Sequence, residues 1–173
     1  MPRKILVLGG ARSGKSRRAQ AIAEGLGPRR LFIATAEAFD DEMAERIRRH
    51  RADRDASWQT VEVPRDLPGA ILAQATAGRP ILVDCLTLWL SNLLLGDADL
   101  ETAGEALAQA VLECAAPLVM VANEVGFGIV PENALARRFR DAAGRLNQRI
   151  AAAADTVELV VAGLPWPLKG PTE

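Results

Sequence analysis

Residues 4–16 read KILVLGGARSGKS, and this stretch decides the fold. The apolar run KILVL is typical of a strand buried on both faces. It leads directly into a match to the phosphate-binding motif G-x-x-x-x-G-K-[ST], formed by Gly9, Gly10, Ala11, Arg12, Ser13, Gly14, Lys15 and Ser16. Residues 15–26 then carry Ala19, Ile22, Ala23 and Leu26 at the spacing of one helix face. The stretch therefore predicts strand, phosphate loop and helix in succession.

This order predicts a nucleotide site. Glycines allow the backbone N–H groups to turn inward around phosphate oxygens, and the N-terminus of the following helix adds partial positive charge. Lys15 is expected to reach the β- and γ-phosphates as a catalytic residue, and the Ser16 hydroxyl to bind Mg²⁺. A chance glycine-rich turn is disfavoured, because the motif has both the buried strand before it and the amphipathic helix after it.

Outward from the loop, short apolar strands alternate with helical patterns. We expect strands at 31–35, 60–63, 80–84, 118–122 and 156–162, and helices at 40–55, 67–77, 100–116 and 132–154, with a further apolar helix that follows the strand at 80–84 and runs through residue 95. Such alternation predicts an α/β fold with a mostly parallel central sheet and helices on both faces. The length of 173 residues predicts a single P-loop domain over 1–173, with the Pro/Gly-rich residues 163–173 as an irregular C-terminal tail.

Composition narrows the class of protein. Hydrophobic residues make up 49% and charged residues 25%, as in a globular fold. The formal net charge of −1 argues against nucleic acid as a partner, because that needs a basic surface. Cys85 and Cys114 lie far apart, outside zinc or redox spacings, and predict a reduced, cytoplasmic setting. The longest apolar stretch, 81–95, is interrupted by polar residues, so no membrane span is expected.

Two acidic residues follow predicted strands. Asp84 comes directly after Ile81-Leu82-Val83 and is the candidate for holding the metal and the nucleotide, since ligands lie at the carboxyl ends of parallel strands. The alternative for Asp84 is an N-cap of the next helix. Glu124, in the run Asn123-Glu124-Val125-Gly126, occupies an equivalent position. A catalytic role and a solvated loop position remain equal alternatives for Glu124.

The only histidine of the sequence, His50, lies in an arginine-rich helical pattern, EMAERIRRHR. One interpretation places it at the edge of a packing face with Met43 and Ile47. The other notes that the helix expected at 40–55 holds Arg46, Arg48, Arg49, Arg51 and Arg54, which form a local anion site. Nearby cations disfavour the imidazolium, so His50 would stay neutral and could attack phosphorus. Some of these arginines are expected to pair with glutamates on a solvated face.

Four segments together resemble one family. They are GGARSGKS (9–16), DDEMAERIRRHR (40–51), NEVGFGIVPEN (123–133) and RFRDAAGRLNQRIAAAAD (138–155). In this order they resemble the bifunctional adenosylcobinamide kinase/adenosylcobinamide-phosphate guanylyltransferase of cobalamin biosynthesis. The resemblance extends from the N-terminus to about residue 163. The phosphate loop alone is generic, whereas the other three segments are more specific.

The resemblance implies a RecA-like P-loop fold, a homotrimer and two reactions. ATP or GTP phosphorylates the aminopropanol hydroxyl of adenosylcobinamide. GTP then guanylylates a histidine, and GMP passes to adenosylcobinamide phosphate to give adenosylcobinamide-GDP. The family's nucleophilic histidine falls on His50, and Arg51 beside it is placed with the nucleotide contacts. Glu62 and Asp84 fall where the family contacts the guanine nucleotide, and Trp58 matches a family position or is simply a packed aromatic.

Two alternatives belong to other classes of function. In the first, the chain is a P-loop small-molecule kinase without guanylyl transfer, and His50 is structural. In the second, it is a nucleotide switch or assembly ATPase that does no chemistry on a metabolite. Both keep the phosphate loop and differ only in what the rest of the chain does.

Overall fold

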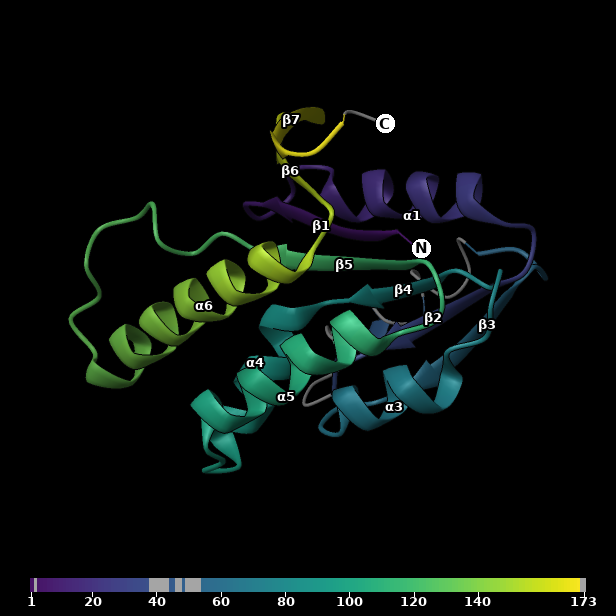
Figure 1. Ribbon diagram of the computed structural model, residues 1–173. Helices are drawn as coiled ribbons and strands as arrows, with labels where there is room; N and C mark the ends of the chain where they lie inside the picture. The colour runs from purple at the N-terminus through teal and green to yellow at the C-terminus, as the bar shows by residue number, and fades with distance from the viewer. Residues whose placement is uncertain (2, 38–43, 46–47, 49–53, 172–173) are drawn as a thin grey trace.

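A seven-stranded sheet forms the centre of the protein, in the order β3-β2-β4-β5-β1-β6-β7 (Figure 1). The computed structural model describes residues 1, 3–37, 44–45, 48 and 54–171. The helix expected at 40–55 lies largely outside these residues, although Ala44, Glu45 and Arg48 have helical backbone. His50 and Arg51 also lie outside them.

The strands and helices alternate along most of the chain. The strands are β1 (Lys4–Gly9), β2 (Arg30–Ala34), β3 (Trp58–Glu62), β4 (Ile81–Asp84), β5 (Leu118–Asn123), β6 (Thr156–Val161) and β7 (Leu164–Lys169). The helices are α1 (Lys15–Leu26), α3 (Leu67–Gln74), α4 (Leu86–Leu95), α5 (Leu100–Glu113) and α6 (Ala134–Ala153). All strand pairs are parallel except β6–β7. The predicted α/β fold with a mostly parallel sheet is confirmed.

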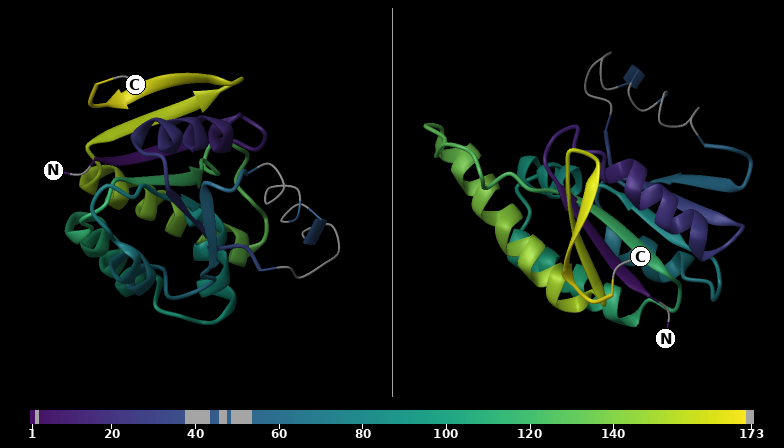
Figure 2. Two further views of the ribbon diagram at one scale, coloured as in Figure 1. Left: turned by 90° about the vertical axis from the view of Figure 1, so that its right-hand side faces the viewer. Right: turned by 90° about the horizontal axis from the view of Figure 1, so that it is seen from above.

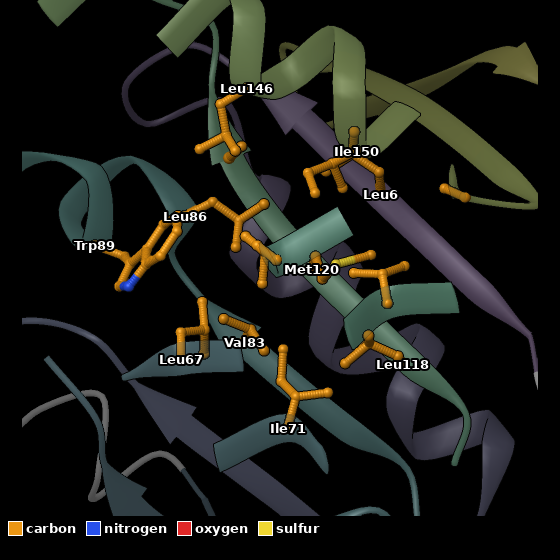
Figure 3. Packing of buried hydrophobic residues seen from close by; sticks show 14 of the residues in the cluster. Leu6, Leu67, Ile71, Val83, Leu86, Trp89, Leu118, Met120, Leu146 and Ile150 are labelled. Atoms are coloured by element: carbon orange, nitrogen blue, oxygen red, sulfur yellow. The ribbon is translucent and has the colours of Figure 1, made fainter. Parts of the chain in front are cut away.

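Helices cover both faces of the sheet (Figures 1 and 2). One face packs against α1 through a cluster that includes Ile5, Val7, Phe32, Leu82 and Val121. The other packs against α3, α4, α5 and α6 through a larger cluster, in which Leu6, Val83 and Met120 of the strands meet Leu86 and Ile150 of the helices (Figure 3). Because successive strand residues point to opposite faces, β1, β2, β4, β5 and β6 each supply buried residues to both clusters.

The expected irregular tail at 163–173 is wrong, since Leu164–Lys169 forms β7, antiparallel to β6. Val161 pairs with Leu164, so Ala162 and Gly163 alone form the turn. Both have positive φ, 53° and 80°, which is the geometry of a type I′ hairpin. Alanine is an unusual residue there, and Pro165 and Pro167 suggest a break in structure. The sequence therefore lacks the usual hairpin signals.

A buried ion pair ties α1 to the sheet. Arg18 of α1 donates through Nε and Nη2 to the two carboxylate oxygens of Glu158 on β6, at 2.8 Å each. The Glu158 side chain is fully buried and that of Arg18 is 23% exposed. The hydrogen bonds to Glu158 raise the pKa of Arg18. The pair holds the helix that begins at the phosphate loop against the strand beside β1.

Replacing Arg18 by Ala should leave the Glu158 carboxylate buried without this partner. Removal of one member of a buried pair costs about 3–5 kcal/mol, so we expect a loss of that order in the free energy of unfolding, measured by urea denaturation. Arg17→Ala is the matched control, since Arg17 is exposed on the same helix. Equal stabilities for the two variants would contradict a stabilising role for the pair.

Candidate functional site

The phosphate loop follows β1 and bends back over its end. Gly14 has φ 93° and Arg12 has φ 55°, so the loop turns twice through the left-handed region. A Cβ built on Gly9 would lie 2.4 Å from Ser13 Oγ and 2.8 Å from the carbonyl oxygen of Val160. The backbone at Gly9 therefore approaches its neighbours more closely than any side chain allows.

The N-terminus of α1 differs from those of the other described helices. The N-caps of α3, α4, α5 and α6 are Asp66, Cys85, Asp99 and Asn133, and the side chain of each accepts a backbone N–H. In α1, Gly14 provides no side-chain cap, and the first turn has no acidic residue. The first N–H groups of a helix need an acceptor, and a phosphate supplies it where no side chain does.

Backbone hydrogen bonds hold the loop on both sides. The N–H of Glu124, just after β5, donates to Gly9 O at 3.0 Å, and the N–H of Gly163 in the β6–β7 turn donates to Ser13 O at 2.8 Å. Within the loop, Lys15 Nζ donates to Gly10 O at 3.0 Å. The loop is thus shaped before any nucleotide arrives, which lowers the entropy cost of binding.

A polar group inside the loop also lacks a protein partner. The Ser13 hydroxyl is buried and has no hydrogen bond to any of the described residues. Buried hydroxyl groups are normally paired, so an unpaired one beside a phosphate loop fits an oxygen-rich ligand. Residues 9–16 therefore form a loop between β1 and α1 with an uncapped helix N-terminus and an unpaired buried hydroxyl, both of which are compatible with the expected phosphate loop.

Asp84 and Glu62 lie at one level of the sheet. Ala34 of β2 pairs with Asp84 on one side and with Glu62 on the other, so the Cα atoms of the two acidic residues are two strand spacings, or about 10 Å, apart. Asp84 also pairs with Val121, which packs on the α1 face. Residues at one level of a parallel sheet share a face, so both acids project from the face on which α1 and its loop lie.

Asp84 does not cap the following helix, because the N-cap of α4 is Cys85, whose sulfur accepts the N–H of Leu88 at 3.4 Å. Burial, and then the nearby Asp84, raise the pKa of the Cys85 thiol to about 11. Cys85 is therefore no thiolate nucleophile at neutral pH. The N-cap alternative for Asp84 is therefore wrong, and Asp84 is the last residue of β4.

Glu124 has a local structural role. Its Oε1 accepts the N–H of Gly126 at 2.9 Å, and its own N–H bonds to the loop as described above. The carboxylate thus stabilises the turn after β5. Its neighbour Asn123 differs, because the buried Oδ1 has no hydrogen-bond partner among the described residues.

Two side chains of α4, Asn92 and Trp89, hold the loops that follow β2 and β3. Asn92 Nδ2 donates to the carbonyl oxygens of Thr35 at 2.7 Å and Pro64 at 3.0 Å, and Trp89 Nε1 donates to Arg65 O at 2.6 Å. The Thr35 hydroxyl donates to Cys85 O and accepts its N–H. Sequence reasoning missed these residues, although a buried Asn within the apolar run of α4 was a possible signal.

Comparison with known proteins decides the family. Residues 5–168 match the family described as cobinamide kinase / cobinamide phosphate guanyltransferase. The bifunctional adenosylcobalamin biosynthesis protein CobP of Pseudomonas aeruginosa is 51% identical over 169 residues, which cover 95% of this chain and 96% of that protein. The protein CobU of Salmonella typhimurium, with the same description, is 47% identical over 180 residues, covering 95% and 99%. The chain belongs to this family.

Membership confirms the resemblance seen in the four sequence segments, and it makes the chain an enzyme of the cobinamide kinase / guanyltransferase family in cobalamin biosynthesis. A protein from Pyrococcus horikoshii OT3 has a similar structure, with a TM-score of 0.55 and 9% identity over 99% of this chain and 88% of that one. At this identity the likeness supports the α/β fold alone. No helix within the described ranges is long and apolar enough to cross a membrane.

The structure describes several side chains that lie near His50 in the sequence. His50 and Arg51 lie outside the described residues. Arg48 pairs with Glu45 at 2.7 Å, as expected for a solvated helix face. Arg54 lies over the ring of Phe32, 3.6 Å from its centroid. Trp58 packs edge-on against Phe32 with a centroid distance of 6.3 Å, which favours the packed-aromatic interpretation.

The close approach of the Gly9 backbone to its neighbours can be tested with two alanine variants, one at Gly9 and one at Gly10. Gly9→Ala should force Ser13 or the end of β6 to move, and overpacking of this kind costs about 1–3 kcal/mol. We expect a lower melting temperature and at least tenfold weaker GTP binding by calorimetry. Gly10→Ala is the control, because a Cβ there meets nothing within 4 Å. If both variants bind GTP equally well, the account of the loop is wrong.

Proposed function

We propose that this enzyme phosphorylates adenosylcobinamide with ATP or GTP and then transfers GMP from GTP to adenosylcobinamide phosphate, acting in the cytoplasm. The single observation that carries the proposal is the preformed phosphate loop at an uncapped helix N-terminus, in a chain of the cobinamide kinase / guanyltransferase family. The relatives named as bifunctional cover nearly the whole chain at 46–51% identity and support the pairing of two reactions.

In the kinase reaction, the loop holds the triphosphate while the hydroxyl oxygen of the corrinoid attacks the γ-phosphorus. A new P–O bond forms, the bond to the β–γ bridging oxygen breaks, and its electron pair stays on the nucleoside diphosphate. The hydroxyl proton is released to solvent. Lys15 and the N–H groups of the loop stabilise the charge on the phosphate oxygens, which is the main protein contribution to phosphoryl transfer.

In the guanylyl transfer, we assign the nucleophile to His50. A neutral imidazole nitrogen forms a bond to the α-phosphorus of GTP, and pyrophosphate leaves with the electron pair of the broken P–O bond. An oxygen of adenosylcobinamide phosphate then attacks the same phosphorus, and the P–N bond breaks to free the histidine. Arg51, Glu62 and Asp84 are assigned to the guanine nucleotide on the resemblance, and the shared level of the two acids in the sheet is compatible with this.

The donors near the loop fit Mg²⁺ carried with the nucleotide. We assign the Ser16 hydroxyl and the Asp84 carboxylate to the ion. Within the described part of the chain no three His, Cys, Asp or Glu residues form a metal cluster, and Mg²⁺ commonly uses one or two protein ligands beside phosphates and waters. When bound, the ion neutralises negative charge on the phosphates.

We also propose a homotrimer, as in the family. The hairpin at the edge of the sheet supports it: Leu164, Trp166 and Leu168 alternate along β7 and are 54–72% exposed. Exposed apolar groups of this kind mark contact surfaces. Pro165 and Pro167 have no N–H to offer a further strand, so the contact would use side chains rather than strand addition.

Incubation with Mg²⁺ and α-³²P-GTP, without corrinoid, tests the covalent step. We expect label to stay on the denatured chain, in an acid-labile and alkali-stable form typical of a phosphoramidate, and to be absent from His50→Ala. Lys15→Ala should lose both the label and the kinase reaction, because the phosphates lose their cationic contact.

The alternatives make different predictions. An unlabelled wild-type chain that still phosphorylates the corrinoid is a kinase without guanylyl transfer, and His50 is then structural. A chain that hydrolyses nucleotide only with a protein partner, and gives no corrinoid product by mass spectrometry, is a nucleotide switch. Guanylyl transfer at the wild-type rate in His50→Ala would remove the covalent histidine from the mechanism.

For the assembly, Trp166→Glu should place a charge on the apolar face of the hairpin. We expect the mass by light scattering to fall from three chains of 18.5 kDa to one. Leu112→Glu is the control, since Leu112 on α5 is 62% exposed, close to the 64% of Trp166. A trimer that survives Trp166→Glu, or a wild-type monomer, would contradict the proposed contact.

A further inference from the structure

Residues 125–130, between β5 and α6, form an exposed apolar segment that we call the apolar loop. The side chains of Phe127, Ile129 and Val130 are 83%, 96% and 61% exposed, and that of Val125 is 36% exposed. The segment contains no charged residue. Apolar side chains that gather on a surface mark a binding site, because their contact with water is unfavourable. The apolar loop is therefore a surface that lacks its ligand.

Hydrogen bonds hold both ends of the apolar loop. Before it, the N–H of Glu124 donates to Gly9 O at 3.0 Å, and Glu124 Oε1 accepts the N–H of Gly126 at 2.9 Å. After it, Arg137 Nη1 donates to Pro131 O at 2.8 Å and to the carbonyl oxygen of the next residue at 2.5 Å. Because the backbone is held at both ends, less conformational freedom is lost when a ligand binds.

The apolar loop begins beside the phosphate loop. β5 is parallel to β1, so both strands end on one side of the sheet, at its left in Figure 1. Phe127 lies three residues beyond Glu124, and that length of chain spans at most about 11 Å. The loops after β1 and β5 lead to helices on opposite faces, α1 and α6, and ligands of open α/β sheets bind where such loops diverge. Phe127 is thus within reach of a substrate at the phosphate loop.

The chemistry of the acceptor substrate matches an apolar surface. The hydroxyl of adenosylcobinamide must meet the γ-phosphorus at the phosphate loop, whereas its corrin ring lies beyond the aminopropanol arm. The periphery of that ring carries methyl groups and neutral amides. A large ligand of this kind is bound mainly by apolar and aromatic side chains, with few polar contacts. The ring therefore needs an apolar surface a short distance from the phosphate loop.

We propose that the apolar loop binds the corrin ring of adenosylcobinamide and of its phosphate. Phe127, Ile129 and Val130 pack against the methyl-bearing periphery of the ring, and the burial of these side chains supplies binding free energy. The inference rests on the proposed function and locates its acceptor substrate. The apolar face of β7 is separate, because β7 lies at the edge of the sheet beyond β6, whereas β5 is a central strand.

The test measures the kinetics of both corrinoid substrates in Phe127→Ala, Phe127→Leu and Ile129→Ala. We expect Phe127→Ala to raise the KM of adenosylcobinamide and of its phosphate about tenfold or more, with kcat and the nucleotide KM within about threefold. Ile129→Ala should raise both corrinoid KM values about threefold or more, because a smaller contact is lost. Phe127→Leu should restore most of the loss of Phe127→Ala, since it keeps an apolar contact.

Leu112→Ala is the matched control. Leu112 is 62% exposed on α5, which ends shortly before β5 begins, so it lies near the opposite end of that strand from the apolar loop. Its corrinoid KM values should equal those of the wild type. Labelling by α-³²P-GTP without corrinoid is the internal control, and its rate should stay within about twofold in every variant, because this step needs no corrinoid.

Wild-type corrinoid KM values in Phe127→Ala would overturn the proposal. A labelling rate that falls as far as the corrinoid reactions do would also overturn it, because the loop would then act on the nucleotide. A second copy of the chain is the competing occupant of the apolar loop. A fall in the mass of Phe127→Ala by light scattering, relative to the wild type, would make the loop a contact between chains and overturn the proposal.

Failure of this inference and failure of the proposed function give different results. A wild-type protein without labelling or without corrinoid phosphate would refute the proposed function itself. A wild-type protein active in both reactions, with Phe127 variants that behave like it, would refute only the role of the apolar loop. Melting temperatures of all variants should match the wild type, because substitutions of exposed side chains change stability little.

Discussion

The first N–H groups of α1 need acceptors, and the rest of the site is arranged around that requirement. The other described helices meet it with their own N-cap side chains, whereas α1 begins at Gly14 with no side-chain cap. A phosphate group is an acceptor of the right charge and size. The buried pair of Arg18 and Glu158 keeps the helix against the sheet, so its N-terminus cannot turn away to find another partner.

The loop is shaped by both neighbours of β1. The turn between β6 and β7 bonds to it from one side, and the residue after β5 bonds to it from the other. On the β5 side, α4 and α6 fix the backbone of Asn123 in turn, and α4 also anchors the loops after β2 and β3. The carboxyl ends of the parallel strands thus hold the candidate nucleotide contacts, the candidate metal ligand and the polar groups that position them.

The class of fold could be predicted from the sequence because most of the central strands are apolar and because the phosphate motif occurs between a strand and a helix. The prediction failed at β7, where the turn places an alanine at positive φ and prolines interrupt the strand. It placed Asp84 at a strand end, as the structure does. It did not indicate the unpaired Oδ1 of Asn123, since an unpaired buried atom is recognised only when every possible partner is placed in three dimensions. The guanylyl reaction came from the family resemblance, as no spacing in the sequence indicates GMP transfer.

The account's central claim is that the loop between β1 and α1 holds the triphosphate. A crystal structure with Mg²⁺ and a β,γ-imido analogue of GTP tests it most directly. We predict β-phosphate oxygens enclosed by the backbone N–H groups of residues 12–16, and a phosphate oxygen within hydrogen-bond distance of Lys15 Nζ. A triphosphate bound elsewhere, or a Lys15 ammonium turned away from it, would contradict the account.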